Sequence, residues 1–173
     1  GKKKILLELG SNSAAVVHED ADLEWAAARI VLGGFGYAGQ VCIKVQRVFV
    51  HAKIYDRFRA LLVEKARTCK TGDPMKKGVV CGPVIDSGHA DRVMTWISEA
   101  KAGGAKILAG GTRKGNVISP TILENVKPTM KVSCREVFGP VVTLESYQNW
   151  PDALKKVNRS LTIHGLLLLP SHQ

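Results

Sequence analysis

Two residues in the first quarter of the chain could carry out acyl chemistry. They are Cys42, in the segment Gly39-Gln-Val-Cys42, and Glu8, in Leu7-Glu8-Leu9-Gly10. A cysteine thiolate is nucleophilic enough to add to a carbonyl without a strong base beside it, so a separate carboxylate is free to activate water. Each residue also has an ordinary interpretation, because free cysteines are often buried as small apolar side chains and a strand glutamate usually points away from the core.

A third segment favours the catalytic interpretation. Arg135-Glu136-Val137-Phe138-Gly139-Pro140 follows the other two, and together the three resemble the aldehyde dehydrogenase superfamily, whose members carry these signatures in this order. The resemblance extends from about Leu6 to about Ser160. It implies an α/β fold, with a mainly parallel sheet and flanking helices, and NAD(P)-dependent oxidation of an aldehyde to a carboxylate.

The resemblance also implies a role for individual residues. Cys42 matches the nucleophile that forms a thiohemiacetal and then a thioester, and Glu8 matches the general base that activates the hydrolytic water. Glu136 matches the carboxylate that binds the nicotinamide ribose hydroxyls, and Phe138 matches the side chain beside the nicotinamide. The Leu9-Gly10 backbone matches the stretch along the nicotinamide ring. For Glu136 the alternative is a surface ion pair with Arg135 or Lys131.

The chain departs from the family pattern in two places. Ser11-Asn12-Ser13 replaces the usual glycine, lysine and serine, and Val41 stands where many relatives have a second cysteine. Ile43 and Lys44 lie in a stretch that helps to line the substrate tunnel in the family. The residues do not indicate which aldehyde would fit.

Length is a larger departure, because 173 residues are typical of one domain. No Gly-x-Gly-x-x-Gly opens a helix, and Gly33-Gly34-Phe35-Gly36 is interpreted as a helix stop. We expect residues 1–10 to be the last strand of an absent nucleotide-binding domain, and residues 11–173 to be a catalytic domain truncated at its C-terminal end. NAD or NADP binding by this fragment alone is then doubtful, and a non-catalytic remnant or dimerisation module, with at most esterase activity, is the alternative function. A CoA-acylating or aldehyde-phosphorylating variant is a lesser alternative.

Composition narrows the class of partner. The net charge is +10, but the basic residues are scattered and aromatic residues are only 6% of the chain, so the sequence does not favour nucleic-acid binding. No apolar run approaches the roughly 20 residues of a membrane span, and no secretory signal is visible. The four cysteines lack metal-ligand spacing, so we expect no metal, reduced thiols and a cytoplasmic location. An uncovered apolar face around Leu6, Leu9 and the Cys42 loop predicts self-association or a homo-oligomer.

Strands and helices alternate along the sequence, as in an α/β fold. Asp20 or Asp22, and Asn149 with Pro151, mark helix starts. The periodicities predict helices at Ile54–Cys69 and Asp86–Ala102, and strands at Lys4–Leu9, Ala14–His18, Arg47–Val50, Lys106–Leu108, Ile118–Ile122, Val141–Tyr147 and Ile163–Leu169.

Overall fold

The structure is a computed structural model that describes residues 3–4, 6, 10–160 and 166–169. Its centre is a sheet with the strand order β3-β6-β7-β2-β1-β8. Four of the five strand pairs are parallel, and the pair of β3 with β6 is antiparallel. The predicted α/β fold with a mainly parallel sheet is therefore confirmed.

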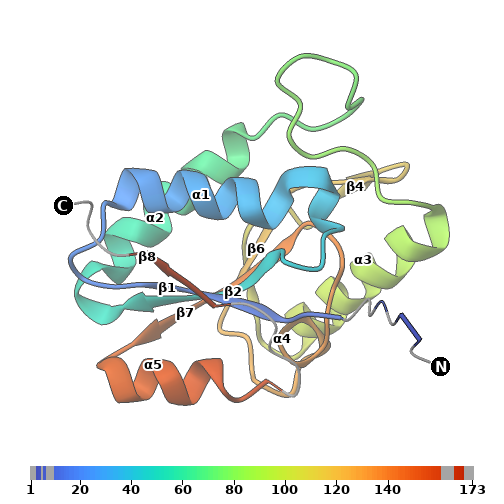
Figure 1. Ribbon diagram of the computed structural model, residues 1–173. Helices are drawn as coiled ribbons and strands as arrows, with labels where there is room; N and C mark the ends of the chain where they lie inside the picture. The colour runs from blue at the N-terminus through green and yellow to red at the C-terminus, as the bar shows by residue number, and fades with distance from the viewer. Residues whose placement is uncertain (1–2, 5, 7–9, 161–165, 170–173) are drawn as a thin grey trace.

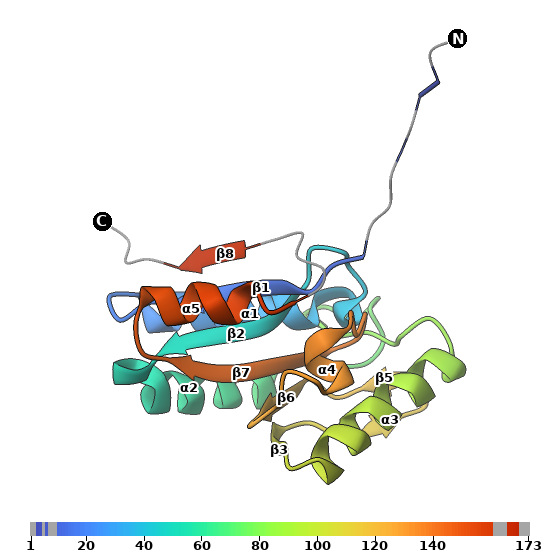
Figure 2. The same ribbon diagram turned by 90° about the horizontal axis from the view of Figure 1, so that it is seen from below.

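Helices cover both faces of this sheet. In Figure 1, α1 and α2 lie on one face and α5 lies on the other, while α3 and α4 lie toward one end of the strands. Figure 2 shows the strands side by side from β8 to β3. The strands are β1 Ser13–Val17, β2 Val45–His51, β3 Lys106–Ala109, β4 Arg113–Lys114, β5 Val117–Ile118, β6 Thr121–Glu124, β7 Val141–Tyr147 and β8 Leu166–Leu169; the helices are α1 Leu23–Phe35, α2 Tyr55–Thr68, α3 Ser87–Ala102, α4 Lys131–Cys134 and α5 Trp150–Val157.

Burial of β1 on both of its faces explains its nearly continuous apolar sequence. In β1, Ala15 and Val17 belong to the larger core with α1 and α2, whereas Ala14 and Val16 pack in a smaller core with Ala153 of α5. Adjacent residues of a strand point to opposite faces. Every residue of β1 and β2 is buried, so these two strands form the rigid centre of the sheet.

The helix starts follow the capping residues. Asp22 accepts a hydrogen bond from the backbone N–H of Trp25, so of the two aspartates considered it is Asp22 that caps α1. Asn149 caps α5 in the same way, with Pro151 in the first turn. The expected helix stop is also present, because α1 ends at Phe35 and is followed by Gly36.

Three expectations about strands need correction or fall outside the described residues. The predicted strand Ile118–Ile122 is wrong, because Ser119 and Pro120 separate β5, which pairs with β4 in a hairpin, from β6 in the main sheet. Proline cannot donate to a strand ladder, which accounts for the break. The predicted strands Lys4–Leu9 and Ile163–Leu169 fall partly on residues outside the described ranges, and of the latter only Leu166–Leu169 is seen as β8.

Candidate active site

The three segments singled out in the sequence lie at one edge of the sheet. Gly10 precedes β1, Cys42 precedes β2, and Glu136 precedes β7. Because β7, β2 and β1 are parallel neighbours, the loops before them meet at the amino-terminal ends of the strands. This end of the sheet lies near α4 in Figure 2. Parallel pairing thus brings together segments that are far apart in the sequence.

Gly10 and Glu136 are in direct proximity. A Cβ atom added at Gly10 would lie 2.8 Å from Oε2 of Glu136, so the carboxylate rests against the Gly10 backbone. Lys131, one of the two partners considered for a surface ion pair, instead binds Glu99 with Nζ 2.8 Å from Oε1. Glu8 and Leu9, the predicted base and the neighbour of Gly10, lie outside the described residues.

Cys42 differs from the other cysteines in its exposure. Its residue is exposed, and Ile43 beside it is 75% exposed. Cys81 is buried, and burial raises the pKa of its thiol to about 12. All four cysteines are free. The thiol at the candidate site is therefore the one most open to a reagent.

The backbone before Cys42 adopts an unusual conformation. Tyr37, Ala38 and Gly39 have φ angles of 52°, 57° and 68°, which lie in the left-handed region that L residues seldom occupy. A Cβ at Gly39 would overlap the carbonyl oxygen of Gly139. The Cys42 loop (residues 36–44) and the Glu136 loop (residues 135–140) are thus packed backbone against backbone, at a point where only glycine fits.

Gln46 of β2 fixes the Glu136 loop from the side of the sheet. Its buried amide donates to the carbonyl oxygens of Val132 and Arg135, at 3.2 and 2.6 Å, and its Oε1 accepts from the N–H of Val137 at 2.8 Å. These contacts use three of the four hydrogen-bonding sites of an amide side chain. Gln46, which was not among the residues singled out in the sequence, lies two positions after Lys44.

Helix α3 fixes the same loop from its other side. His89 Nε2 donates to the carbonyl oxygen of Phe138 at 2.6 Å, and Arg92 donates to the carbonyl oxygen of Val137 at 2.7 Å. Phe138 is half-buried with φ of 50°, and its ring stands edge-on to His89 with 6.4 Å between the centroids. A bulky residue held in this region of φ is typical of functional sites.

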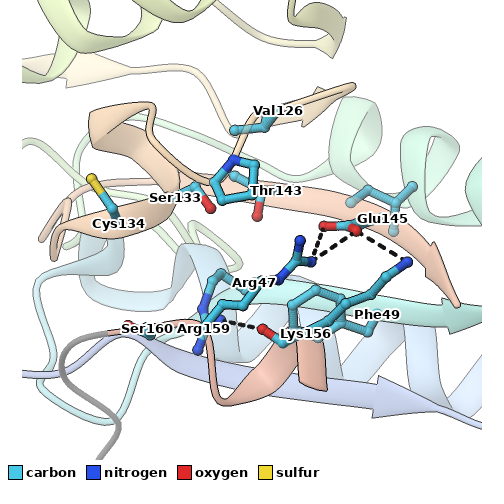
Figure 3. Close-up of a pocket in the computed structure, with 12 residues that line it drawn as sticks. Arg47, Phe49, Val126, Ser133, Cys134, Thr143, Glu145, Lys156, Arg159 and Ser160 are labelled. Atoms are coloured by element: carbon cyan, nitrogen blue, oxygen red, sulfur yellow. Dashed lines mark hydrogen bonds and ion pairs between the residues drawn. The ribbon is translucent and has the colours of Figure 1, made fainter. Parts of the chain in front are cut away.

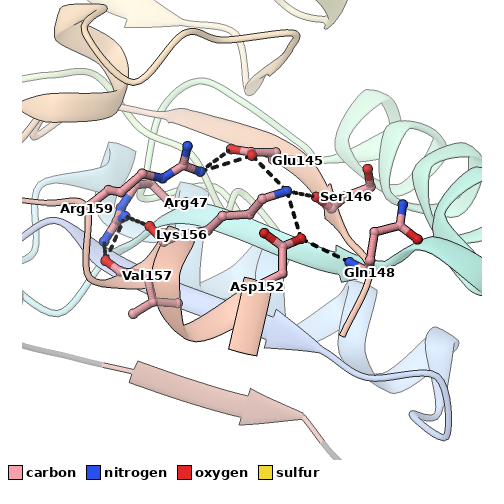
Figure 4. A network of polar contacts seen from close by, with 8 residues as sticks. All are labelled: Arg47, Glu145, Ser146, Gln148, Asp152, Lys156, Val157 and Arg159. Atoms are coloured by element: carbon pink, nitrogen blue, oxygen red, sulfur yellow. Dashed lines mark hydrogen bonds and ion pairs between the residues drawn. The ribbon is translucent and has the colours of Figure 1, made fainter. Parts of the chain in front are cut away.

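A hollow on the α5 side of the sheet carries several charged side chains (Figure 3). Figure 4 shows that these charges are already satisfied: Arg159 and Lys156 pair with Glu145, and Lys156 also pairs with Asp152. Arg47 is buried and donates five hydrogen bonds of 2.9–3.2 Å to the carbonyl oxygens of Asn12, Lys156 and Val157. The cluster therefore has a structural role, and Arg47 joins the end of α5 to the segment before β1.

Replacing Arg47 by methionine should destabilise the fold by about 3 kcal/mol, because three carbonyl oxygens lose their donor and the end of α5 loses a cation. Urea unfolding monitored by circular dichroism measures this. The matched control is Arg159→Met, which removes a more exposed ion pair and should cost less than about 1 kcal/mol. Equal effects for the two variants would contradict this role for Arg47.

Two kinds of feature are absent from the described part of the chain. No group of three or more His, Cys, Asp or Glu side chains there could hold a metal ion. Among the same residues, no helix is long and apolar enough to cross a membrane.

Comparisons with known proteins agree with the geometry. The profile of the aldehyde dehydrogenase family matches residues 1–163. The chain is 48% identical over 160 residues to 3-sulfolactaldehyde dehydrogenase of Priestia megaterium, covering 92% of this chain and 34% of that protein. It is 42% identical over 166 residues to sulfoacetaldehyde dehydrogenase of Neptuniibacter caesariensis, covering 96% and 36%. The chain thus spans about a third of the length of these curated relatives.

Solved structures give the same result. Betaine aldehyde dehydrogenase of Staphylococcus aureus in complex with NAD+ superposes with a TM-score of 0.88 at 29% identity, covering 96% of this chain and 39% of that one. Aldehyde dehydrogenase 21 of Physcomitrella patens, in complex with the product succinate, has a TM-score of 0.87 at 33% identity, covering 97% and 40%. Sequence, fold and site segments lead to one conclusion: the chain belongs to the aldehyde dehydrogenase family.

Proposed function

We propose that this chain supplies the thiol-bearing part of an NAD(P)-dependent aldehyde dehydrogenase. The observation that carries the proposal is the convergence of the Gly10, Cys42 and Glu136 segments at one edge of the sheet, with Cys42 exposed and Glu136 against Gly10. In the proposed division of the chain, residues 1–10 end a nucleotide-binding domain and residues 11–173 belong to the catalytic domain.

The residues at this edge fit a nicotinamide cofactor. A carboxylate accepts hydrogen bonds from hydroxyl groups, as Glu136 would from the nicotinamide ribose. Glycine at position 10 lets that carboxylate lie against the backbone, where a side chain would collide with it; by family resemblance, Leu9 and Gly10 would lie along the nicotinamide ring and Phe138 at its end. NAD or NADP, when bound, supplies the acceptor for a hydride.

The chain's own residues would carry out the acyl chemistry. The Cys42 thiolate adds to the aldehyde carbon, and the carbonyl oxygen takes the electron pair of the π bond. Loss of hydride from that carbon leaves a thioester on Cys42. Glu8 then takes a proton from water as the water adds to the thioester, and the C–S bond breaks to restore the thiolate and release a carboxylic acid. The acid ionises to the carboxylate, and Glu8 returns its proton to solvent. The backbone N–H of Cys42 would donate to the oxyanion.

The proposal stops at the class of substrate. Two relatives are named for sulfonated aldehydes, and others for benzaldehyde and betaine aldehyde. Because these aldehydes differ in charge and shape, family membership alone does not select among them.

Self-association and a cytoplasmic location are part of the same proposal. Leu6 and Tyr37, in the segments before Gly10 and Cys42, are 87% and 83% exposed. Large apolar side chains left exposed around a site favour association with another surface.

The test uses a chromogenic ester, because acylation of a thiol and hydrolysis need no hydride acceptor. We expect the purified chain to release a burst of about one nitrophenolate per chain from p-nitrophenyl acetate. Cys42→Ala should abolish the burst, whereas Glu8→Gln should keep the burst and slow the later turnover by about 100-fold. Cys134→Ala is the matched control and should behave as the wild type.

Equal and slow acetylation of all four cysteines would overturn the proposal. The chain would then be the alternative considered above, a folded module without catalysis. Measuring burst amplitude and turnover separately distinguishes the loss of the nucleophile from the loss of the base.

A further inference from the structure

Lys44 is a buried lysine two residues after Cys42. Its residue is only 5% exposed, although lysine is almost never fully buried unless it is paired. Burial lowers the pKa of its ammonium group to about 7, and the negative charge of Glu136 offsets part of that effect. The Cys42 loop therefore places an ionisable amine group inside the protein, where the charge of the carboxylate proposed for cofactor binding influences its protonation.

The Lys44 side chain links the Cys42 loop to the first residue of β7. Its Nζ donates to the carbonyl oxygen of Val141, the first residue of β7. The β2–β7 ladder begins later, at Arg47 and Thr143. Val141 thus lies beyond the reach of strand pairing with β2, and Lys44 supplies a donor at the point where the Glu136 loop enters β7.

Two neighbouring contacts show that this loop is held from several sides. Gln46 binds it through Arg135 and Val137, and Arg92 of α3 binds it through Val137. Gln46 is uncharged, and Glu136 acts on Arg92 as it does on Lys44, offsetting part of the lowering of the Arg92 pKa by burial. The charge of Glu136 therefore acts on one basic side chain from the Cys42 loop and on one from α3.

We propose that Lys44 is a positioning residue for the site: its buried amine group ties the Cys42 loop to the start of β7 and, when protonated, attracts the Glu136 carboxylate of the adjoining loop. The inference rests on the proposed function, which assigns Cys42 and Glu136 their roles. Lys44 itself touches no reacting atom. The ordinary alternative is a lysine whose buried stem only fills space.

The first test measures the coupling between Lys44 and Glu136. In a chain labelled with ¹³C at the lysine side chains, NMR should show one lysine that titrates near pH 7. Glu136→Gln should shift that titration to lower pH, because the attraction for the protonated amine is gone. Glu99→Gln, which removes the partner of Lys131 elsewhere on the surface, is the control and should leave it unchanged. An unchanged titration in Glu136→Gln would overturn the proposal.

The second test measures positioning through the ester burst. Lys44→Met keeps the length of the side chain but removes the donor and the charge. It should leave the burst amplitude at about one per chain and slow its rate constant about 10-fold, since small displacements of reacting groups have large effects on rate. A burst as fast as the wild type would contradict the proposal.

The two proposals fail in different ways. If the wild-type chain shows no burst that depends on Cys42, the proposed function fails whatever Lys44 does. If Lys44→Met does not fold, the Glu136→Gln titration still decides the matter, because it leaves Lys44 in place.

Discussion

Gly39→Ala should destabilise the fold by about 3 to 5 kcal/mol, as measured by urea unfolding. The added methyl group has two costs. It places an L residue at φ of 68°, and it drives Cβ into the backbone of Gly139 and Pro140. The backbone at both sides is fixed, so the clash cannot be relieved by rotating a side chain.

Gly115→Ala is a matched control for this prediction. Gly115 has a similar φ of 59°, but a Cβ there would meet nothing within 4 Å. Gly115→Ala should therefore lower the free energy of unfolding only by the cost of placing an L residue at positive φ, about 1 to 2 kcal/mol. If both variants lose the same small amount of stability, the two loops do not pack as closely as the structure indicates.

The stability of the protein should rise with pH above neutrality because of Lys44. Its folded pKa of about 7 lies below the ordinary value of 10.5. Between these values the unfolded chain keeps a proton that the folded chain releases, so the free energy of unfolding increases with pH. Below pH 7 both states are protonated, and the buried charge reduces stability. Relative to Lys44→Met, the wild type should gain about 2 to 3 kcal/mol between pH 6.5 and pH 9.

Urea unfolding of both proteins at three or four pH values checks this result. Lys131→Met is the control, because Lys131 is an exposed lysine bound to Glu99 and its loss should leave the pH dependence of the wild type unchanged. Parallel stability curves for the wild type and Lys44→Met would show that Lys44 has the same protonation state when folded and unfolded.

The fold could be predicted wherever the signal was local. Val141–Tyr147 was predicted with the bounds that the structure has, because a short apolar run follows Gly139-Pro140. Asp22 and Asn149 marked helix starts through hydrogen bonds to residues three positions ahead. The split at Ser119 and Pro120 was missed because the apolar residues on both sides form one continuous pattern.

The candidate site was predictable only in part. Family resemblance placed Gly10, Cys42 and Glu136 in one site, and the structure brings Gly10 against Glu136 and packs the Cys42 loop on the Glu136 loop. The roles of Gln46 and Lys44 could not be predicted, because their hydrogen bonds join residues about 90 positions apart in the sequence. The left-handed run before Cys42 was equally hidden, since Tyr37 and Ala38 carry no local signal for positive φ.

The site segments all lie at the amino-terminal ends of β1, β2 and β7, so none of these segments lies at the carboxyl-terminal ends of the same strands. The turns after β1, β2 and β7 leave from those carboxyl-terminal ends, and β2 and β7, at seven residues each, separate the two ends by about 20 Å. A fluorescent label on the exposed side chain of Gln148, in the turn after β7, would therefore be held at a fixed distance from Cys42. The distance from this label to a second label or ligand at Cys42 could then report ligand binding without changing any of the loops that form the site.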